Sequence, residues 1–174
     1  MEKLVSIGAS ILGTGRMFKM LFNLSPMYRR SGGRLVKVTD DLKYVKIKLP
    51  LNYKTRNYVG TLYGGHMYSC VDGIYMIQLV RILGKDYVVW DKSATIKFKR
   101  PGDKTLYAEF VISESLLEQI KCEITELNEK DYHLMVDLKD AEGNVYANIE
   151  KVIYIADKNF YREKKKAQIN IVNK

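Results

Sequence analysis

The chain has 174 residues, of which 47% are hydrophobic and 11% aromatic, a composition that predicts one folded domain and excludes disorder as its main state. Its formal net charge of +9 suits an anionic partner, but no nucleic-acid-binding signature is present. No run approaches the ~18 apolar residues of a membrane span, and the two cysteines lack a CxxC spacing, so we expect a cytoplasmic protein with reduced thiols.

Charge is spread unevenly along the chain. Residues 1–56 carry twelve Lys and Arg against three Asp and Glu, whereas residues 101–157 carry thirteen acidic residues against five basic ones. The basic parts suit a lipid surface or a phosphate-rich small molecule. Residues 158–174 are basic again and are predicted to be a solvated, partly ordered tail after a single domain over residues 1–157.

The first predicted element is an amphipathic helix over about residues 4–24. Its apolar side chains fall on one helical stripe, formed by Leu4, Ile7, Ile11, Phe18 and Phe22. Packing of this stripe on the domain is the favoured interpretation. Attachment of the helix to a membrane surface stays open as an alternative.

Alternating apolar residues then predict a hairpin over residues 34–49, with its turn at Asp40–Asp41. A single long helix is predicted next, from Gly64 to Leu83, with Gly84 ending it. Apolar residues cover nearly the whole circumference of this segment, so we expect the helix to be buried on all sides.

The remaining segments predict strands and one short helix. Two strands are expected, one on either side of a turn at Pro101–Gly102–Asp103. A helix is predicted within residues 114–130. A hairpin is predicted over residues 132–157, with its turn at residues 140–144. A wholly buried helix needs a sheet that wraps it, and the chain shows no βαβ alternation. The predicted class is therefore α+β, with a curved antiparallel sheet around one helix.

Asp72 is the unusual residue of the predicted central helix, because burying an ionised carboxylate without partners is costly. Two interpretations stay open. Asp72 is either a structural carboxylate, held by hydrogen bonds or at a subunit boundary, or a base or nucleophile at the edge of a cleft.

The pair Gly64 and Gly65 precedes this acid at the predicted start of the helix. Free N–H groups of a first helical turn, not shielded by Cβ atoms, are suited to an oxyanion hole. Asn57, in the loop before the helix, is a candidate for orienting a water or a carbonyl, or else an Asx-turn residue. Asp72 lies ~10 Å along a helix from Gly65, too far to act on the same carbonyl within one subunit. A second subunit would close that gap.

Residues 57–72, NYVGTLYGGHMYSCVD, resemble the signature of hot-dog-fold thioesterases of the phenylacetyl-CoA thioesterase type. The positions that match this signature are Asn57, Gly60, Gly64, Gly65 and Asp72. The later segment VVWDKSATIKFKRPGD is similar to the strand of that family which leads to a proline-containing turn. The similarity covers most of residues 10–157 and is greatest to an uncharacterised bacterial branch, a domain of unknown function.

This resemblance implies a hot-dog fold, a homodimer or homotetramer, and an acyl-CoA thioesterase-like hydrolase with its active site between subunits and no cofactor. It implies that Asp72 acts across the interface, as nucleophile or as activator of water. The N–H at Gly64 would receive the thioester oxygen, Asn57 would orient the reacting groups, and the residue at Asp91 would assist. The acyl group is not specified.

Tyr63 stands where the family carries histidine, and a phenol is not a base at neutral pH. This favours an alternative function, a non-catalytic acyl-CoA-binding or lipid-binding protein. The candidates for substrate binding are Tyr63, His66, Asp91, Lys99 and Arg100, although alternating lysines on a strand are most simply solvated. Because His66 and His133 lack metal-ligand spacing, we expect no metal site.

Overall fold

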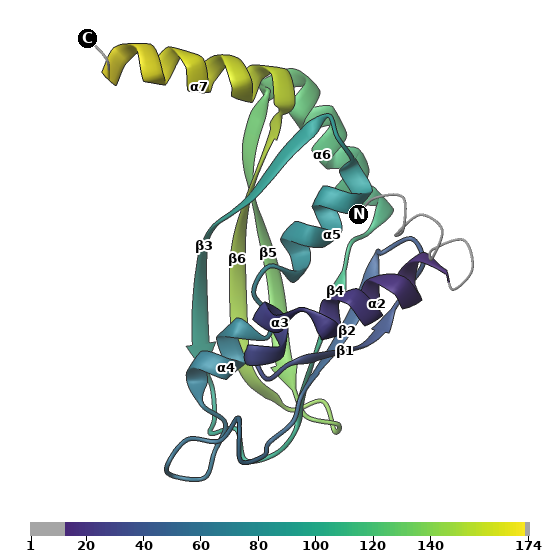
Figure 1. Cartoon of the computed structure of the whole chain (residues 1–174), viewed down its shortest axis with the longest axis vertical. Coiled ribbons are helices and arrows are strands. Elements are labelled where there is room, and N and C mark those ends of the chain that lie inside the picture. Colours follow the sequence, from purple (N-terminus) through teal and green to yellow (C-terminus); the bar gives the residue numbers. More distant parts are fainter. Residues whose placement is uncertain (1–12, 173–174) are drawn as a thin grey trace.

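The computed structural model describes residues 13–172, which form one six-stranded antiparallel sheet and six helices within that range (Figure 1). The elements are, in chain order, α2 (Thr14–Leu24), α3 (Pro26–Arg30), β1 (Arg34–Val38), β2 (Tyr44–Leu49), α4 (Gly64–Ser69), α5 (Ile74–Leu83), β3 (Tyr87–Phe98), β4 (Leu106–Val111), α6 (Glu114–Leu127), β5 (Glu129–Lys139), β6 (Val145–Asp157) and α7 (Lys158–Val172). The strand order is β1-β2-β4-β5-β6-β3, so β1 and β3 are the two edges of the sheet.

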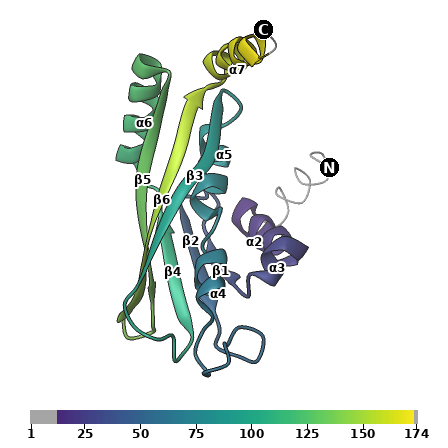
Figure 2. The ribbon, with the colours of Figure 1, turned by 90° about the vertical axis from the view of Figure 1, so that its left-hand side faces the viewer.

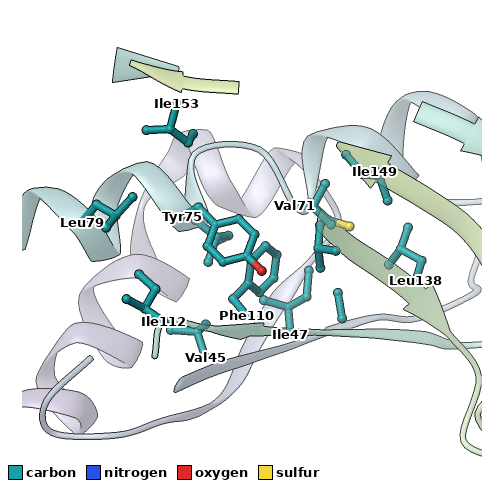
Figure 3. Packing of buried hydrophobic residues seen from close by; sticks show 14 of the residues in the cluster. Val45, Ile47, Val71, Tyr75, Leu79, Phe110, Ile112, Leu138, Ile149 and Ile153 are labelled. Atoms are coloured by element: carbon teal, nitrogen blue, oxygen red, sulfur yellow. The ribbon is translucent and has the colours of Figure 1, made fainter. Parts of the chain in front are cut away.

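The core lies between the sheet and the helices α4 and α5, which lie against one face of it (Figure 2). Alternating residues of the strands point toward these helices and are fully buried, among them Val45, Ile47 and Ile149. Tyr75 of α5 packs edge-to-face on Phe110 of β4, with ring centroids 4.9 Å apart (Figure 3). The predicted α+β class, with a curved antiparallel sheet around a central helical segment, is confirmed.

The prediction of one continuous helix from Gly64 to Leu83 is wrong. Residues 70–73 form turns that separate α4 from α5, and Gly73 has a φ of +73°. Glycine adopts this left-handed conformation without the steric cost that a Cβ atom imposes. The apolar residues on both sides of the break are buried, which is why their pattern looked continuous.

The two predicted hairpins are present as β1–β2 and β5–β6. The strands on either side of Pro101–Gly102–Asp103 also form, as β3 and β4, but they are not neighbours. β3 pairs only with β6, whereas β4 lies between β2 and β5. This connection packs against the preceding loop, where the Leu62 N–H donates to the Gly102 carbonyl at 2.7 Å.

The helices α2, α3, α6 and α7 complete the fold. In α2, Phe18 and Phe22 pack against the core, in agreement with the favoured interpretation; Leu4, Ile7 and Ile11 lie outside the described residues. The predicted helix after β4 is α6. The basic tail, predicted as partly ordered, is helical as α7, which lies across the end of β6 (Figure 1). Within residues 13–172, none of the helices has the length and apolarity needed to cross a bilayer.

Candidate active site

Asp72 lies in the turn between α4 and α5, immediately before the left-handed Gly73. Its side chain is 49% exposed. The break in the helix therefore places the carboxylate at the edge of the core, where one side contacts protein and the other is open to solvent. The turn thus explains why an apolar segment contains an acid: it lets the Asp72 side chain reach solvent.

Lys151 of β6 holds this carboxylate. Its Nζ donates a hydrogen bond of 2.6 Å to Oδ1 of Asp72, and the lysine side chain is only 2% exposed. The lysine was not identified from the sequence. Its position in the alternating pattern of β6 could have identified it. Lys151 is in phase with the buried Ile149 and Ile153, on a strand whose alternate residues point into the core.

Asp91 completes a charged cluster, which we call the Asp72–Lys151–Asp91 cluster. Asp91 lies on the edge strand β3, opposite Ile153 of β6, and a bulge at the next residue interrupts the pairing. Its Oδ1 lies 3.1 Å from Nζ of Lys151, an ion pair whose geometry falls short of a hydrogen bond. The structure thus brings the two predicted acids together through one buried cation.

The electrostatics of the cluster follow from its partial burial. Burial raises the pKa of Asp91, and the positive charge of Lys151 opposes this shift only in part. Burial lowers the pKa of Lys151, but the hydrogen bond to Asp72 and the charges of both acids outweigh it, so the net pKa is raised. Lys151 is therefore an ammonium at neutral pH.

Tyr68 adds a second donor to Asp72. Its hydroxyl donates to Oδ1 of Asp72 at 3.1 Å, and burial raises the pKa of this phenol, so it keeps its proton. Lys151 and Tyr68 thus bind the same carboxylate oxygen. Within the described part of the chain, Oδ2 of Asp72 has no hydrogen-bond partner.

Gly64 and Gly65 begin α4, and both make room for aromatic rings. A Cβ atom on Gly64 would lie 3.0 Å from Cζ of Phe98, and one on Gly65 would lie 2.3 Å from Cε1 of Tyr63. Neither glycine N–H has a hydrogen-bond partner among residues 13–172. Tight packing thus explains the glycine pair, and the N–H groups remain available.

An open depression of about 390 Å³ lies beside Gly64. Phe98 at the end of β3 lines it together with Met67 and with Lys99 and Arg100, which follow the strand. The predicted substrate-binding residues Lys99 and Arg100 therefore lie next to the glycine pair. Asp72 does not line this depression, so the structure does not join the two predicted halves of the site within one chain.

Asn57 is an Asx-turn residue in this structure. Its Oδ1 accepts the N–H groups of Val59 and Thr61, each at 3.1 Å, and its Nδ2 donates to Oγ1 of Thr61 at 3.0 Å. These contacts close the loop on itself. Asn57 is therefore engaged in shaping the segment before α4, and the structure does not bring it to Asp72.

Tyr63 and His66 contact each other at the start of α4. Tyr63 is 56% exposed and packs its ring against that of His66, with centroids 5.6 Å apart. Nδ1 of His66 lies 2.9 Å from the carbonyl oxygen of Ser31. Since a carbonyl only accepts, Nδ1 is the donor. His66 lines a separate pocket with three arginines, so it is not a base for a substrate beside Gly64.

Comparison with known proteins agrees with this fold. The family model described as a domain of unknown function (DUF4442) matches residues 14–155. A search of curated protein sequences found no match. Among solved structures, PA5026 from Pseudomonas aeruginosa, a protein of unknown function described as a probable thioesterase, has a TM-score of 0.71 at 20% identity and covers 82% of this chain and 95% of its own.

Two further structures share the architecture. The thioesterase HI1161 from Haemophilus influenzae has a TM-score of 0.59 at 13% identity, over 83% of this chain and 91% of its own. The E. coli PaaI protein, from the phenylacetic acid degradation operon, has a TM-score of 0.51 at 12% identity, over 77% and 86%. These likenesses, together with the family match, confirm the resemblance drawn from residues 57–72: the chain belongs to the DUF4442 family and has the hot-dog fold of thioesterase-like proteins.

Proposed function

We propose that this protein is an acyl-CoA thioesterase whose active site forms between two copies of the chain. One observation carries the proposal: a half-exposed carboxylate, Asp72, is held through Oδ1 by a buried ammonium while its Oδ2 is left open. Such an arrangement fixes the orientation of the free oxygen, which is what a general base requires.

In the proposed reaction, Oδ2 of Asp72 accepts a proton from a water molecule while the water oxygen attacks the thioester carbonyl. The resulting oxyanion is stabilised by the N–H groups of Gly64 and Gly65 from the second copy. The C–S bond then breaks, and the CoA thiolate takes the proton from Asp72. Carboxylate, water and N–H donors suffice, so the reaction requires no cofactor.

The edge strand β3 supports the idea of a second copy. β3 pairs with β6 on one side, and its other side has no strand partner among the described residues. Its twelve residues include the exposed Trp90 and Phe98, and the cluster residue Asp91 lies on it. An unprotected edge strand is a template for pairing with another chain. Pairing two copies along β3, as a homodimer or within a homotetramer, would bring a second chain next to the cluster.

The test is hydrolysis of a panel of acyl-CoA substrates, measured as the release of free CoA thiol. We expect Asp72→Asn to lower kcat/KM by at least ~10²-fold, the usual contribution of a general base. Asp86→Asn is the matched control, because Asp86 is exposed on the loop before β3. Hydrolysis by Asp72→Asn at the wild-type rate would remove Asp72 from the mechanism.

A second candidate function is binding of an acyl-CoA or lipid without turnover. The observation that favours it is Tyr63, whose phenol replaces the histidine of the family and packs on Gly65 and His66. The same panel separates the two functions. Saturable binding of an acyl-CoA by the wild-type protein, with no thiol released over hours, would establish the binding protein and exclude the hydrolase.

A further inference from the structure

A second pocket at the start of α4 shares no lining residue with the depression beside Gly64. We call it the basic pocket and define it by Arg29 and Arg30 of α3, Arg34 of β1, Lys54 of the loop after β2, and His66 of α4. Its volume is about 320 Å³, and no acidic residue lines it. The segment RRSGGR, residues 29–34, thus folds three arginines around one hollow.

The charges in the basic pocket have no counter-charge. None of the four cationic side chains forms an ion pair with any residue in the described range. Elsewhere on the surface, lysines such as Lys46 and Lys130 pair with glutamates. Four like charges around one concave surface repel each other and raise the local concentration of anions.

Hydrogen bonds and close packing hold the segments around the basic pocket. Ser31 Oγ donates to the Tyr28 carbonyl at 2.7 Å, and the Tyr28 hydroxyl donates to the Cys70 carbonyl at 3.0 Å. His66 Nδ1 donates to the Ser31 carbonyl. Gly32 has a φ of +78°, and a Cβ atom there would lie 2.6 Å from Thr55 Cγ2. Residues 29–34, the loop that carries Lys54 and the start of α4 are therefore held in fixed positions relative to one another.

We propose that the basic pocket binds a phosphate group. A guanidinium presents paired N–H donors that match two phosphate oxygens, and three of the four cations are arginines. A phosphate dianion neutralises more of the four charges than a single carboxylate does. The pocket does not include Asp72 or Gly64, so this proposal does not depend on thioester hydrolysis. The group belongs either to a soluble phosphate ester or to a phospholipid headgroup.

The test uses the full chain and inorganic phosphate as the probe, titrated by calorimetry at constant ionic strength. We expect the double variant Arg30→Gln/Arg34→Gln to weaken phosphate binding by at least ~10-fold, since each charged hydrogen bond is strong. Both arginines are exposed, so the fold is expected to persist, which circular dichroism checks. The control Lys121→Gln/Lys166→Gln removes the same charge from exposed helix positions and is expected to change binding by less than about two-fold.

Two outcomes would overturn the proposal: no binding of phosphate to the wild-type protein, or an equal loss in the pocket variant and the control. The variant Asp72→Asn is expected to bind phosphate as the wild type does, which separates this test from that of hydrolysis. Binding of CoA and of vesicles containing phosphatidate is then compared between wild type and the pocket variant. A loss confined to CoA identifies a soluble ester, and a loss confined to vesicles identifies a lipid headgroup; each supports the phosphate site.

Discussion

Lys151 and Asp72 are 79 positions apart in the chain, yet their side chains meet at 2.6 Å, with the lysine buried and the aspartate half exposed. Lys151 lies halfway along β6, and its side chain points into the core toward the aspartate. This contact links β6, which lies next to the edge strand β3, to the turn between α4 and α5. The same contact therefore contributes to the stability of the fold and orients the carboxylate of the proposed catalytic Asp72.

Removing the cation is expected to destabilise the protein. Lys151→Met leaves Asp91, which is largely buried, without its counter-charge, and breaking a buried ion pair costs ~3–5 kcal/mol. Because Asp72 is half exposed, we expect a smaller loss of about 1–3 kcal/mol in the free energy of unfolding. Urea denaturation measures it. The double variant Lys151→Met/Asp91→Asn should recover most of the loss, and a single variant as stable as wild type would contradict the role of the cluster.

The pH dependence of stability is expected to carry the signature of Asp91. Its pKa is raised above the ordinary 3.8 in the folded state, mainly by burial, so the folded protein binds this proton more tightly. The contribution of Asp91 to the free energy of unfolding therefore falls as pH rises from about 3.8 through the folded pKa. Asp91→Asn removes this loss, so the stability of the variant relative to wild type should increase as pH rises from about 3.8 through the folded pKa of Asp91.

Urea denaturation at a series of pH values measures the Asp91 contribution as a difference between variant and wild type. Asp86→Asn serves as the control, since Asp86 is exposed and has no described ion pair. A difference between Asp91→Asn and wild type that stays constant over this pH range would show that Asp91 does not titrate there.

A site shared between two copies predicts complementation. Asp72→Asn removes the proposed base, and Gly64→Val blocks the approach to the proposed N–H donors; each alone should be inactive. In a symmetric dimer, random mixing of the two variants makes half of the molecules heterodimers. Each heterodimer has one site with both groups intact and one site with both groups removed. Activity should therefore return to about a quarter of wild type. Co-refolded variants assayed for thiol release measure this. No recovery, with dimers confirmed by light scattering, would contradict a site shared between two copies.

Gly73 is expected to be needed for its backbone conformation alone. Its φ is +73°, and a Cβ atom there would meet only Cδ1 of Ile77 at 4.0 Å, so a side chain has room. Gly73→Ala should therefore lower the free energy of unfolding by ~1 kcal/mol through strain. Gly73→Asn should lose less, because asparagine tolerates left-handed backbone. Equal stability of the alanine variant and wild type, measured by thermal and urea denaturation, would contradict this account.

Several elements were predictable because their signals are local. The alternation of Val45, Ile47 and Leu49 with lysines predicted a strand, and the spacing of Leu117, Ile120 and Ile124 predicted α6. The glycine pair and Asp72 were identified because their types and spacing are unusual. The break at Gly73 was missed, since hydrophobic periodicity reports which residues are buried and not the backbone angles between them.

The sequence by itself determined the α+β class, both hairpins and the residues worth suspecting, because burial periodicity and turn chemistry act over a few residues. Only the tertiary structure decided which of those residues meet. It placed Lys151 between Asp72 and Asp91, turned His66 toward the arginines of the basic pocket, and engaged Asn57 in its own loop. Contacts between distant segments depend on how strands pair and where a helix breaks, and no local pattern contains that information.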